Sequence, residues 1–298
     1  MTDQYSLQDP TTQYPKPDDS WKAYQEGSGT EQEQHPKPDA GESTYRGTGR
    51  LTGRKAVVTG ADSGIGRAAA LAFAREGADV VLSYLPSEEE DAKEVVQLIQ
   101  DAGRKAVAFP GDLTDESYCE QLVQKAVDEF GGIDILANVA GKQQTQESIE
   151  DITTEQFDET MKTNVYAMFW TCKAAVKVMQ PGSTIINTSS IQAYAPSPTL
   201  VDYASTKAQI NAFSKGLAGQ VAPKGIRVNV VAPGPVWTPL QQAGGQPTEA
   251  LSEFGVQTPM GRPGQPAELG PAYVFLASAE SGYITGETLN VNGGMPTP

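Results

Sequence analysis

Short runs of aliphatic and β-branched residues alternate with longer amphipathic stretches from Leu51 to the end of the chain. The apolar runs predict strands, and the amphipathic stretches between them have helical spacing. The predicted strands are 55–59, 79–84, 106–109, 133–137, 184–187, 227–231 and 288–291; the predicted helices are 66–76, 88–102, 116–130, 154–177 and 202–221. Strands that alternate with long helices form parallel sheets covered on both faces. We therefore predict an α/β fold with a single doubly wound (Rossmann) parallel sheet and helices on both faces.

Residues 1–50 do not follow this pattern. They are rich in Gln, Pro, Gly, Asp and Glu, and the segment PKPD occurs at 15–18 and again at 36–39. Such a composition buries too little apolar surface to offset the entropy of ordering. The stretch nevertheless contains more aromatic residues than a flexible tail needs: Tyr5, Tyr14, Trp21, Tyr24 and Tyr45. Two interpretations stay open for this N-terminal arm: a disordered tail, or an extended arm packed on its own or a neighbouring subunit. The folded domain is expected over 51–298.

The net charge of the chain argues against polyanionic binding partners. The 298 residues carry 37 acidic and 22 basic side chains, a net charge of −15. Binding to a phosphate backbone depends on Lys and Arg, so nucleic acid and anionic membranes are excluded as expected partners. No apolar run approaches the roughly 20 residues that cross a bilayer. The first residues, MTDQYSLQDP, have neither a basic start nor an apolar segment, so we expect a cytoplasmic protein.

The scarcity of Cys and His restricts the chemistry. The chain has two Cys, Cys119 and Cys172, which we expect to be buried thiols in a reducing compartment rather than a disulfide. Its single His, His35, lies in the arm. A tetrahedral zinc site or a Ser-His-Asp triad would have to recruit that one residue, so we predict no metal site. Catalysis is expected to depend on Tyr, Ser, Lys, Asn, carboxylates or a bound cofactor.

A glycine-rich turn, TGADSGIG at 59–66, joins the first predicted strand to the first predicted helix. In that position the backbone can approach a pyrophosphate, whose charge then lies at a helix N-terminus. The spacing is G-x-x-x-G-x-G rather than the commoner G-x-G-x-x-G. The turn predicts a dinucleotide site with these members: Gly60, Asp62, Ser63, Gly64, Ile65 and Gly66.

Further motifs follow this turn in a fixed order. They are NVAG at 138–141, Asn164 in KTNVYA, Ser190 in INTSS, YASTK at 203–207 and Pro233-Gly234 in VAPGPVWT. Together with the turn they resemble the classical short-chain dehydrogenase/reductase family over 51–298. SYLPSEEEDA, SSIQAYAPSP and the Pro-rich arm resemble its bacterial general-stress branch, which is glucose/ribitol dehydrogenase-like or broad aldehyde reductase-like. Val139, where the family usually has Asn, and Asn292, where it often has Asp, are minor departures.

YASTK places Tyr203 and Lys207 four residues apart in a predicted helix, so they share a face. Carbonyl reduction needs a hydride and a proton, and Tyr can supply the proton if a cation favours its phenolate. Ser190 lies 13 residues before Tyr203, at a strand end where it can polarise the same carbonyl; Ser189 is the alternative. The resemblance implies that Lys207 also holds the nicotinamide ribose and that Asn164 anchors a proton-relay water. Asn164 could instead make only a backbone bond.

The resemblance also assigns the cofactor contacts. It implies Asp112 and Leu113 at the adenine, with a second group along the riboses and the nicotinamide: Tyr84, Asn138, Ala140, Gly141, Tyr203, Lys207, Pro233, Gly234, Val236 and Thr238. The second strand ends in SYLP, without the acid typical of NAD enzymes or the base typical of NADP enzymes. Asp62 and the acidic residues 88–90 disfavour a 2′-phosphate, so the expected cofactor is NAD(P), with NAD favoured.

A Gly-, Pro- and Gln-rich segment at 239–268 follows the nicotinamide loop and is interpreted as a substrate lid. Four residues are expected to line the substrate pocket, although each could equally be scaffold: Gln192, Tyr194, Lys142 and Trp237.

These residues predict an NAD(P)-dependent oxidoreductase that interconverts an alcohol or polyol with its aldehyde or ketone. A 3-oxoacyl-carrier reductase is the alternative enzyme, which the acidic charge disfavours. A catalytically silent dinucleotide-sensing regulator is the non-enzyme alternative, and it would not need Tyr203, Lys207 and Ser190 together. The resemblance further implies a homotetramer acting on a small molecule.

Overall fold

A computed structural model of the protein describes residues 3–297. Its centre is a parallel sheet of seven strands in the order β3-β2-β1-β4-β5-β6-β7. The strands are β1 (Lys55–Thr59), β2 (Asp79–Tyr84), β3 (Ala106–Pro110), β4 (Ile135–Asn138), β5 (Thr184–Thr188), β6 (Arg227–Pro233) and β7 (Thr288–Val291). The predicted α/β class and the single parallel sheet are therefore confirmed.

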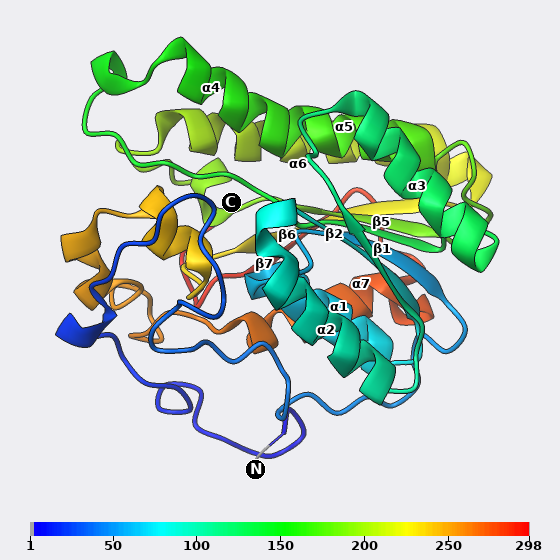
Figure 1. Ribbon diagram of the computed structural model, residues 1–298, viewed down its shortest axis with the longest axis horizontal. Helices are drawn as coiled ribbons and strands as arrows, with labels where there is room; N and C mark the ends of the chain where they lie inside the picture. Colours follow the sequence, from blue (N-terminus) through cyan, green and yellow to red (C-terminus); the bar gives the residue numbers. More distant parts are fainter. Residues whose placement is uncertain (1–2, 298) are drawn as a thin grey trace.

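Helices cover both faces of the sheet (Figure 1). One face carries α1 (Gly64–Arg75), α2 (Glu89–Asp101) and α7 (Gly270–Ala277); the other carries α3 (Glu116–Phe130), α4 (Thr154–Met161), α5 (Ala167–Ala175) and α6 (Val201–Val221). Successive side chains of a strand point to opposite faces, and Val58 and Val57 of β1 accordingly belong to two different apolar cores. The short apolar runs of the sequence are thus central strands buried on both sides.

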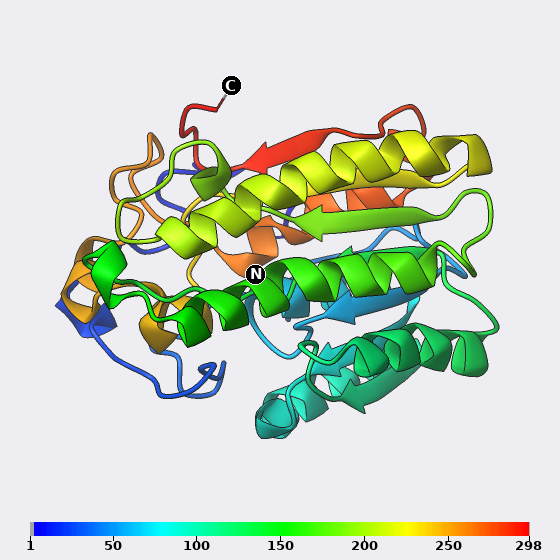
Figure 2. The same ribbon diagram turned by 90° about the horizontal axis from the view of Figure 1, so that it is seen from above.

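The carboxyl ends of the strands meet at one edge of the sheet, and the arrowheads in Figure 2 point toward it. The strand order reverses between β1 and β4, because β1 pairs with β2 on one side and with β4 on the other. Ligands of doubly wound sheets bind outside the carboxyl ends at such a reversal. The fold therefore places the turn after β1 and the segment after β4 on either side of one crevice.

Two helical regions differ from the sequence prediction. The stretch 154–177 was expected to be one helix, but a π-helical turn at Lys162–Tyr166 separates α4 from α5. Helix α7 was not predicted at all. Its sequence, GPAYVFLA, is almost uniformly apolar, so it lacks the polar face on which a periodicity argument depends.

The arm (residues 3–50) runs in an extended path from the edge where the strands end, along α1, to the C-terminal end of that helix. A 3₁₀ turn at Asp19–Trp21 is its only helical element within the described residues. Tyr14, which precedes the first PKPD segment, donates its hydroxyl to Asp39 Oδ2 of the second segment over 2.7 Å. Arg75 of α1 donates to the backbone carbonyls of Gly41 and Tyr45. The arm is thus packed on its own chain.

The lid (residues 239–268) consists of short helical turns beside the arm, at the left of Figure 1. Trp21 of the arm packs on Trp237 with ring centroids 4.4 Å apart, and Leu251 and Phe254 of the lid complete a small apolar core. Trp237 also donates its indole N–H to the carbonyl of Pro36 over 2.8 Å. Arm and lid therefore share a core that is separate from those of the sheet.

Within residues 3–297, no helix combines the length and the apolar character that crossing a bilayer requires.

Candidate active site

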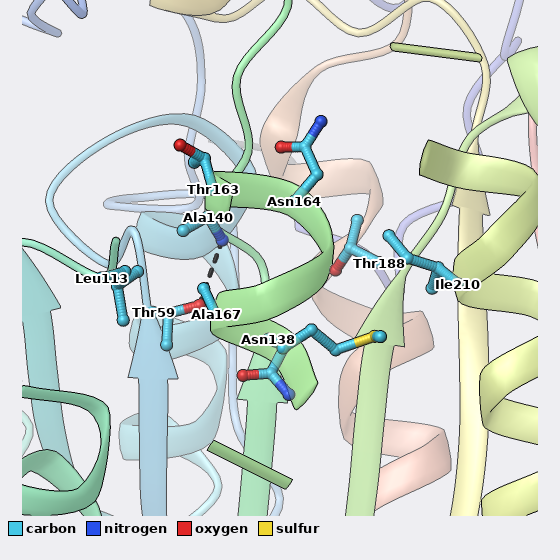
Figure 3. A pocket seen from close by; sticks show the side chains of 10 residues that line it. Thr59, Leu113, Asn138, Ala140, Thr163, Asn164, Ala167, Thr188 and Ile210 are labelled. Carbon is cyan, nitrogen blue, oxygen red and sulfur yellow. Dashed lines mark hydrogen bonds between the residues drawn. The ribbon is translucent and has the colours of Figure 1, made fainter. Parts of the chain in front are cut away.

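The turn between β1 and α1 is tightly folded. Gly60 and Gly64 have φ values of +62° and +50°, in the region that favours glycine. A Cβ on Gly66 would collide with the carbonyl oxygen of Gly60, so the turn needs glycine there. The hydroxyl of Thr59 accepts from the N–H groups of Val139 (2.9 Å) and Ala140 (3.1 Å), which fixes the segment after β4 beside the turn (Figure 3).

The predicted catalytic side chains come from two neighbouring elements. Ser190 follows β5, whereas Tyr203 and Lys207 lie one turn apart in α6. Lys207 Nζ lies 5.3 Å from the Tyr203 ring centroid and donates to the carbonyl of Thr188 over 3.0 Å. The hydroxyl of Ser189 donates to the carbonyl of Lys207 over 2.9 Å, so this alternative serine holds the α6 backbone. Ser190 is the serine whose hydroxyl interacts with the Tyr203 side chain.

Burial dominates the ionisation of both α6 groups. Desolvation raises the pKa of Tyr203 to about 12, and its interaction with the Ser190 hydroxyl opposes that shift. Desolvation lowers the pKa of Lys207 to about 8. The expected lowering of the Tyr203 pKa by Lys207 is therefore not seen: burial raises this pKa, and Tyr203 is a neutral phenol.

Asn164 lies in the π-helical turn and is buried. Its Oδ1 accepts from the N–H of Lys142 (2.7 Å), and its Nδ2 donates to the Lys142 carbonyl (2.9 Å) and to the Thr206 hydroxyl (3.0 Å). A Cβ on Gly141 would lie 3.4 Å from Asn164 Oδ1 and 3.5 Å from Lys207 Nζ. Asn164 thus makes the backbone bonds of a scaffold residue and also borders the same space as Lys207.

Asn138 has a different role from the one expected. It was predicted along the cofactor ribose, but its Nδ2 donates to Asn187 Oδ1 over 2.9 Å and its Oδ1 accepts from the Thr171 hydroxyl over 2.8 Å. Figure 3 shows it beside a small space near Thr188, and it does not border the main cavity. Interior bonds between β4, β5 and α5 therefore occupy its amide.

A cavity of about 910 Å³ opens at the carboxyl edge of the sheet. Apart from Asn138 and Asn164, the predicted catalytic and cofactor residues line it: Gly60, Asp62, Ser63, Gly64, Ile65, Gly66, Tyr84, Asp112, Leu113, Ala140, Gly141, Ser190, Tyr203, Lys207, Pro233, Gly234, Val236 and Thr238. The fold thus brings together motifs that lie as much as 178 positions apart, from Gly60 to Thr238.

Two of the four expected pocket residues line the cavity and two do not. Lys142, which forms a 2.8 Å ion pair with Glu159, and Gln192 lie in its wall. Trp237 is fully buried in the arm–lid core, and Tyr194 is half-buried outside the lining. For Trp237 the reason is physical: Trp21 of the arm covers the ring that was expected to face substrate.

Other lining residues were missed from the sequence. The arm contributes Tyr24, Gly27 and Ser28, and the end of the chain contributes Met295. Amide side chains form much of the remaining wall: Gln143, Gln144, Gln241, Gln246 and Gln257. The Gln-rich composition of the lid was visible in the sequence, but nothing there indicated which amides face inward.

The end of the cavity away from Tyr203 is acidic. Asp62 and Glu88 both line it, and both are largely buried. Burial, with the charge of Glu88, raises the pKa of Asp62 well above its usual range, and burial likewise raises the pKa of Asp91. Asp62 Oδ2 has no hydrogen-bond partner. A carboxylate without a partner at the wall of a cavity can accept from the hydroxyls of a bound ligand.

These features fit a dinucleotide. The glycines let the backbone come close to a diphosphate at the N-terminus of α1, and the Asp62 oxygen can accept from a ribose hydroxyl. The volume of the cavity is near the upper end of the range for small-molecule sites, about 300–1,000 Å³. Within the described residues, no group of three or more His, Cys, Asp or Glu side chains is placed to hold a metal ion.

The sequence is similar to those of known oxidoreductases. The family model described as enoyl-(acyl carrier protein) reductase matches residues 60–296. An uncharacterized oxidoreductase, YghA of Escherichia coli (strain K12), is 57% identical over 97% of this chain and 98% of its own. General stress protein 39 of Bacillus subtilis (strain 168) is 50% identical over 89% and 92%.

A solved structure is similar as well. A short chain dehydrogenase from Burkholderia cenocepacia J2315, in complex with NADP, has a TM-score of 0.77 and 32% identity over 82% of this chain and 98% of its own.

Proposed function

This chain belongs to the short-chain dehydrogenase/reductase family, and from that premise we propose that it is a nicotinamide-dependent oxidoreductase that interconverts an alcohol or polyol with its aldehyde or ketone. One observation carries the proposal: Ser190, Tyr203 and Lys207 line the same cavity as the glycine-rich turn after β1. A phenol, a hydroxyl and a buried cation beside a dinucleotide-sized space are the groups that carbonyl reduction requires.

In this mechanism the bound dinucleotide supplies or accepts the hydride. The Ser190 hydroxyl polarises the substrate carbonyl, and Tyr203, held as a neutral phenol by burial, gives its proton to the carbonyl oxygen. Lys207 retains much of its charge at pH 7, since its lowered pKa is about 8. At 5.3 Å from the ring centroid, this cation stabilises the phenolate that is left.

We propose NAD as the preferred cofactor. Glu88 places a carboxylate at the adenosine end of the cavity, and among the described residues no Lys or Arg lines that end to pair with a 2′-phosphate. The neighbour from Burkholderia carries NADP, but at 32% identity it can differ at these positions.

For the substrate, the amide-rich wall favours a molecule with several hydroxyl groups over a long aliphatic aldehyde. Gln241 Oε1 is buried in the wall without a hydrogen-bond partner and can accept from such a hydroxyl, whereas an alkyl chain would leave it unbonded. An acyl-carrier substrate, which the description of the family model suggests, stays the alternative enzyme.

Thermal-shift titration with NADH and NADPH, followed by a panel of carbonyls and polyols with the preferred cofactor, tests these assignments. We expect a larger shift with NADH and turnover of polyhydroxylated substrates. Equal shifts would remove the NAD preference, and turnover of acyl-thioesters alone would favour the alternative.

We also propose a homotetramer in the cytoplasm. Exposed apolar side chains on the outer helices could be buried by a second copy: Phe157, Tyr166, Phe169 and Val201. Cys119 and Cys172 are free and buried, which fits a reducing compartment. Light scattering coupled to size exclusion, on the wild type and on Phe169→Asp, gives the oligomeric state. A monomeric wild type would refute the assembly.

A further inference from the structure

Glu31 connects the arm to the phosphate-binding turn. Its Oε2 accepts from the N–H of Gly64, the first residue of α1, over 2.9 Å. Its own N–H donates to Asp91 Oδ2 of α2 over 2.7 Å. The side chain is completely buried, and Oε1 has no hydrogen-bond partner. A residue of the irregular N-terminal segment thus lies at the end of the helix where the family's dinucleotide site is built.

The Gly64 N–H is one of the free donors of the first turn of α1, and such donors attract anions. Glu31 occupies this donor and adds a carboxylate at the positive end of the helix dipole. Its charge therefore acts on the same end of α1 as the charge of a diphosphate. The two negative groups repel each other when both are ionised.

Gly64, which Glu31 holds, packs closely against the opposite wall of the cavity. A Cβ at Gly64 would lie 2.9 Å from Thr238 Cγ2, so the turn is pressed against the loop after β6. The neighbouring Trp237 is held by the arm through the Pro36 carbonyl and Trp21. The arm thereby fixes both walls of the cavity, at the turn and at the loop opposite.

We propose that Glu31 is a positioning residue of the dinucleotide site: its carboxyl group holds the phosphate-binding turn through Gly64, and its ionisation controls how strongly that turn attracts a diphosphate. This inference rests on the proposed function, because it needs a dinucleotide as the ligand. It gives the arm, whose Tyr24, Gly27 and Ser28 already line the cavity, a charged group that acts on the dinucleotide.

The surroundings of Glu31 make its charge state sensitive to pH. Arg67 of α1 faces it and favours the carboxylate, whereas Glu42 of the arm and Asp91 of α2 disfavour it. Burial is the largest effect, and it raises the Glu31 pKa to about 7. A diphosphate beside the turn adds negative charge and favours the protonated form further. Binding therefore takes up a proton, and affinity falls as the pH rises through 7.

The test compares two variants of Glu31 with a matched control. Glu31→Gln keeps an oxygen that accepts from Gly64 but cannot ionise, whereas Glu31→Ala removes both the acceptor and the charge. Glu33→Gln changes an exposed carboxylate two residues away on the same arm. The dissociation constant of NADH is measured on the full chain by fluorescence between pH 5.5 and 8.5, and proton uptake by calorimetry in buffers of different ionisation enthalpy.

For the wild type and Glu33→Gln we expect the Kd to rise on the order of tenfold from pH 6 to pH 8, with net proton uptake. Glu31→Gln should show a flatter profile and bind more tightly than the wild type at pH 8. Glu31→Ala should bind about tenfold more weakly than Glu31→Gln at every pH and raise KM for the dinucleotide with little change in kcat, because the turn loses its support.

The same pH slope and proton uptake in Glu31→Gln as in the wild type would overturn the role of its charge. An affinity of Glu31→Ala equal to that of Glu31→Gln would overturn its positioning role. Glu31→Gln keeps the buried bond to Gly64 and stays informative if Glu31→Ala does not fold. A wild type that binds neither NADH nor NADPH would overturn the proposed function together with this inference, whereas an altered Glu31 result with normal wild-type binding concerns the inference alone.

Discussion

The two ends of the cavity bury opposite kinds of charge. At the catalytic end, Lys207 is 3% exposed, and burial lowers its pKa to about 8. At the acidic end, Asp62 is 2% exposed, and burial raises its pKa. In both places desolvation favours the neutral form, so a charge at either end lowers the free energy of unfolding of the protein. Groups with such shifted pKa values cluster at functional sites, where ligand contacts use them.

Substitution of Tyr203 by Phe tests the catalytic end and has the largest expected effect. It removes the proton donor and keeps the ring, so we expect kcat to fall by about 10²–10⁴-fold while the Kd for the dinucleotide stays within a few-fold of wild type. Steady-state kinetics and fluorescence titration measure the two quantities. Tyr194→Phe, outside the cavity wall, is the control and should keep its activity. Near-normal turnover of Tyr203→Phe would refute the mechanism.

Lys207→Met separates function from stability at the same end. Because the folded pKa of about 8 lies below the ordinary value of 10.5, the buried ammonium destabilises the fold at pH 7. The variant should lose activity yet gain on the order of 3 kcal/mol in the free energy of unfolding. That gain should shrink as the pH rises from 8 to 10.5, where the wild type no longer carries the charge when folded. Urea denaturation at several pH values measures it.

Lys215→Met is the control for this experiment, because Lys215 is an exposed residue of the same helix. It should leave stability within about 0.5 kcal/mol at every pH. A destabilised Lys207→Met at pH 7 would mean that the ammonium supports the fold. Burial of charge would then not destabilise the catalytic end of the cavity.

At the acidic end, Asp62→Asn has the smallest expected effect. Because the pKa of Asp62 is raised in the folded protein, its ionised form opposes folding. The contribution of Asp62 to the free energy of unfolding is therefore fully present below pH 3.8 and is lost as the pH rises through the folded pKa. The amide should stabilise the protein at pH 8 by about 1 kcal/mol and raise its affinity for NADPH relative to NADH a few-fold. Paired titrations with both cofactors measure the ratio, and Glu120→Gln, exposed on α3, is the control. An unchanged ratio would contradict the role of Asp62 in discrimination.

Much of the sheet was predictable because its signals are local. The run KAVVT became β1 with the predicted bounds, and DVVLSY became β2, since apolar runs between turns have few other ways to be buried. The π turn at Lys162–Tyr166 was not predictable, because it inserts a residue into a helical stretch whose residue types give no sign of the insertion. Helix α7 was missed because burial on all sides removes the polar face.

The residues of the candidate site also fall into those that a local sequence pattern predicts and those that it does not. Tyr203, Lys207 and Ser190 could be predicted because their spacing is fixed within one strand–helix unit. Trp237 was misplaced because its partner Trp21 lies 216 positions earlier, in a segment without periodicity. Asn138 was misplaced because its amide finds Asn187 and Thr171 only after folding. Glu31 could not be found, since one carboxylate in an acidic segment has no local signal.

The contact of the arm with the lid has a consequence for biosynthesis. A ribosome makes Trp21 216 residues before Trp237, which covers it. It makes Pro10 252 residues before Arg262, whose Nε donates to the Pro10 carbonyl over 2.8 Å. Until Trp237 and Arg262 have been made, the arm lacks these partners and is accessible to proteases and chaperones. Docking of the arm therefore follows synthesis of the lid, and a nascent protein truncated before the lid would be distinguishable by an arm that proteases cleave.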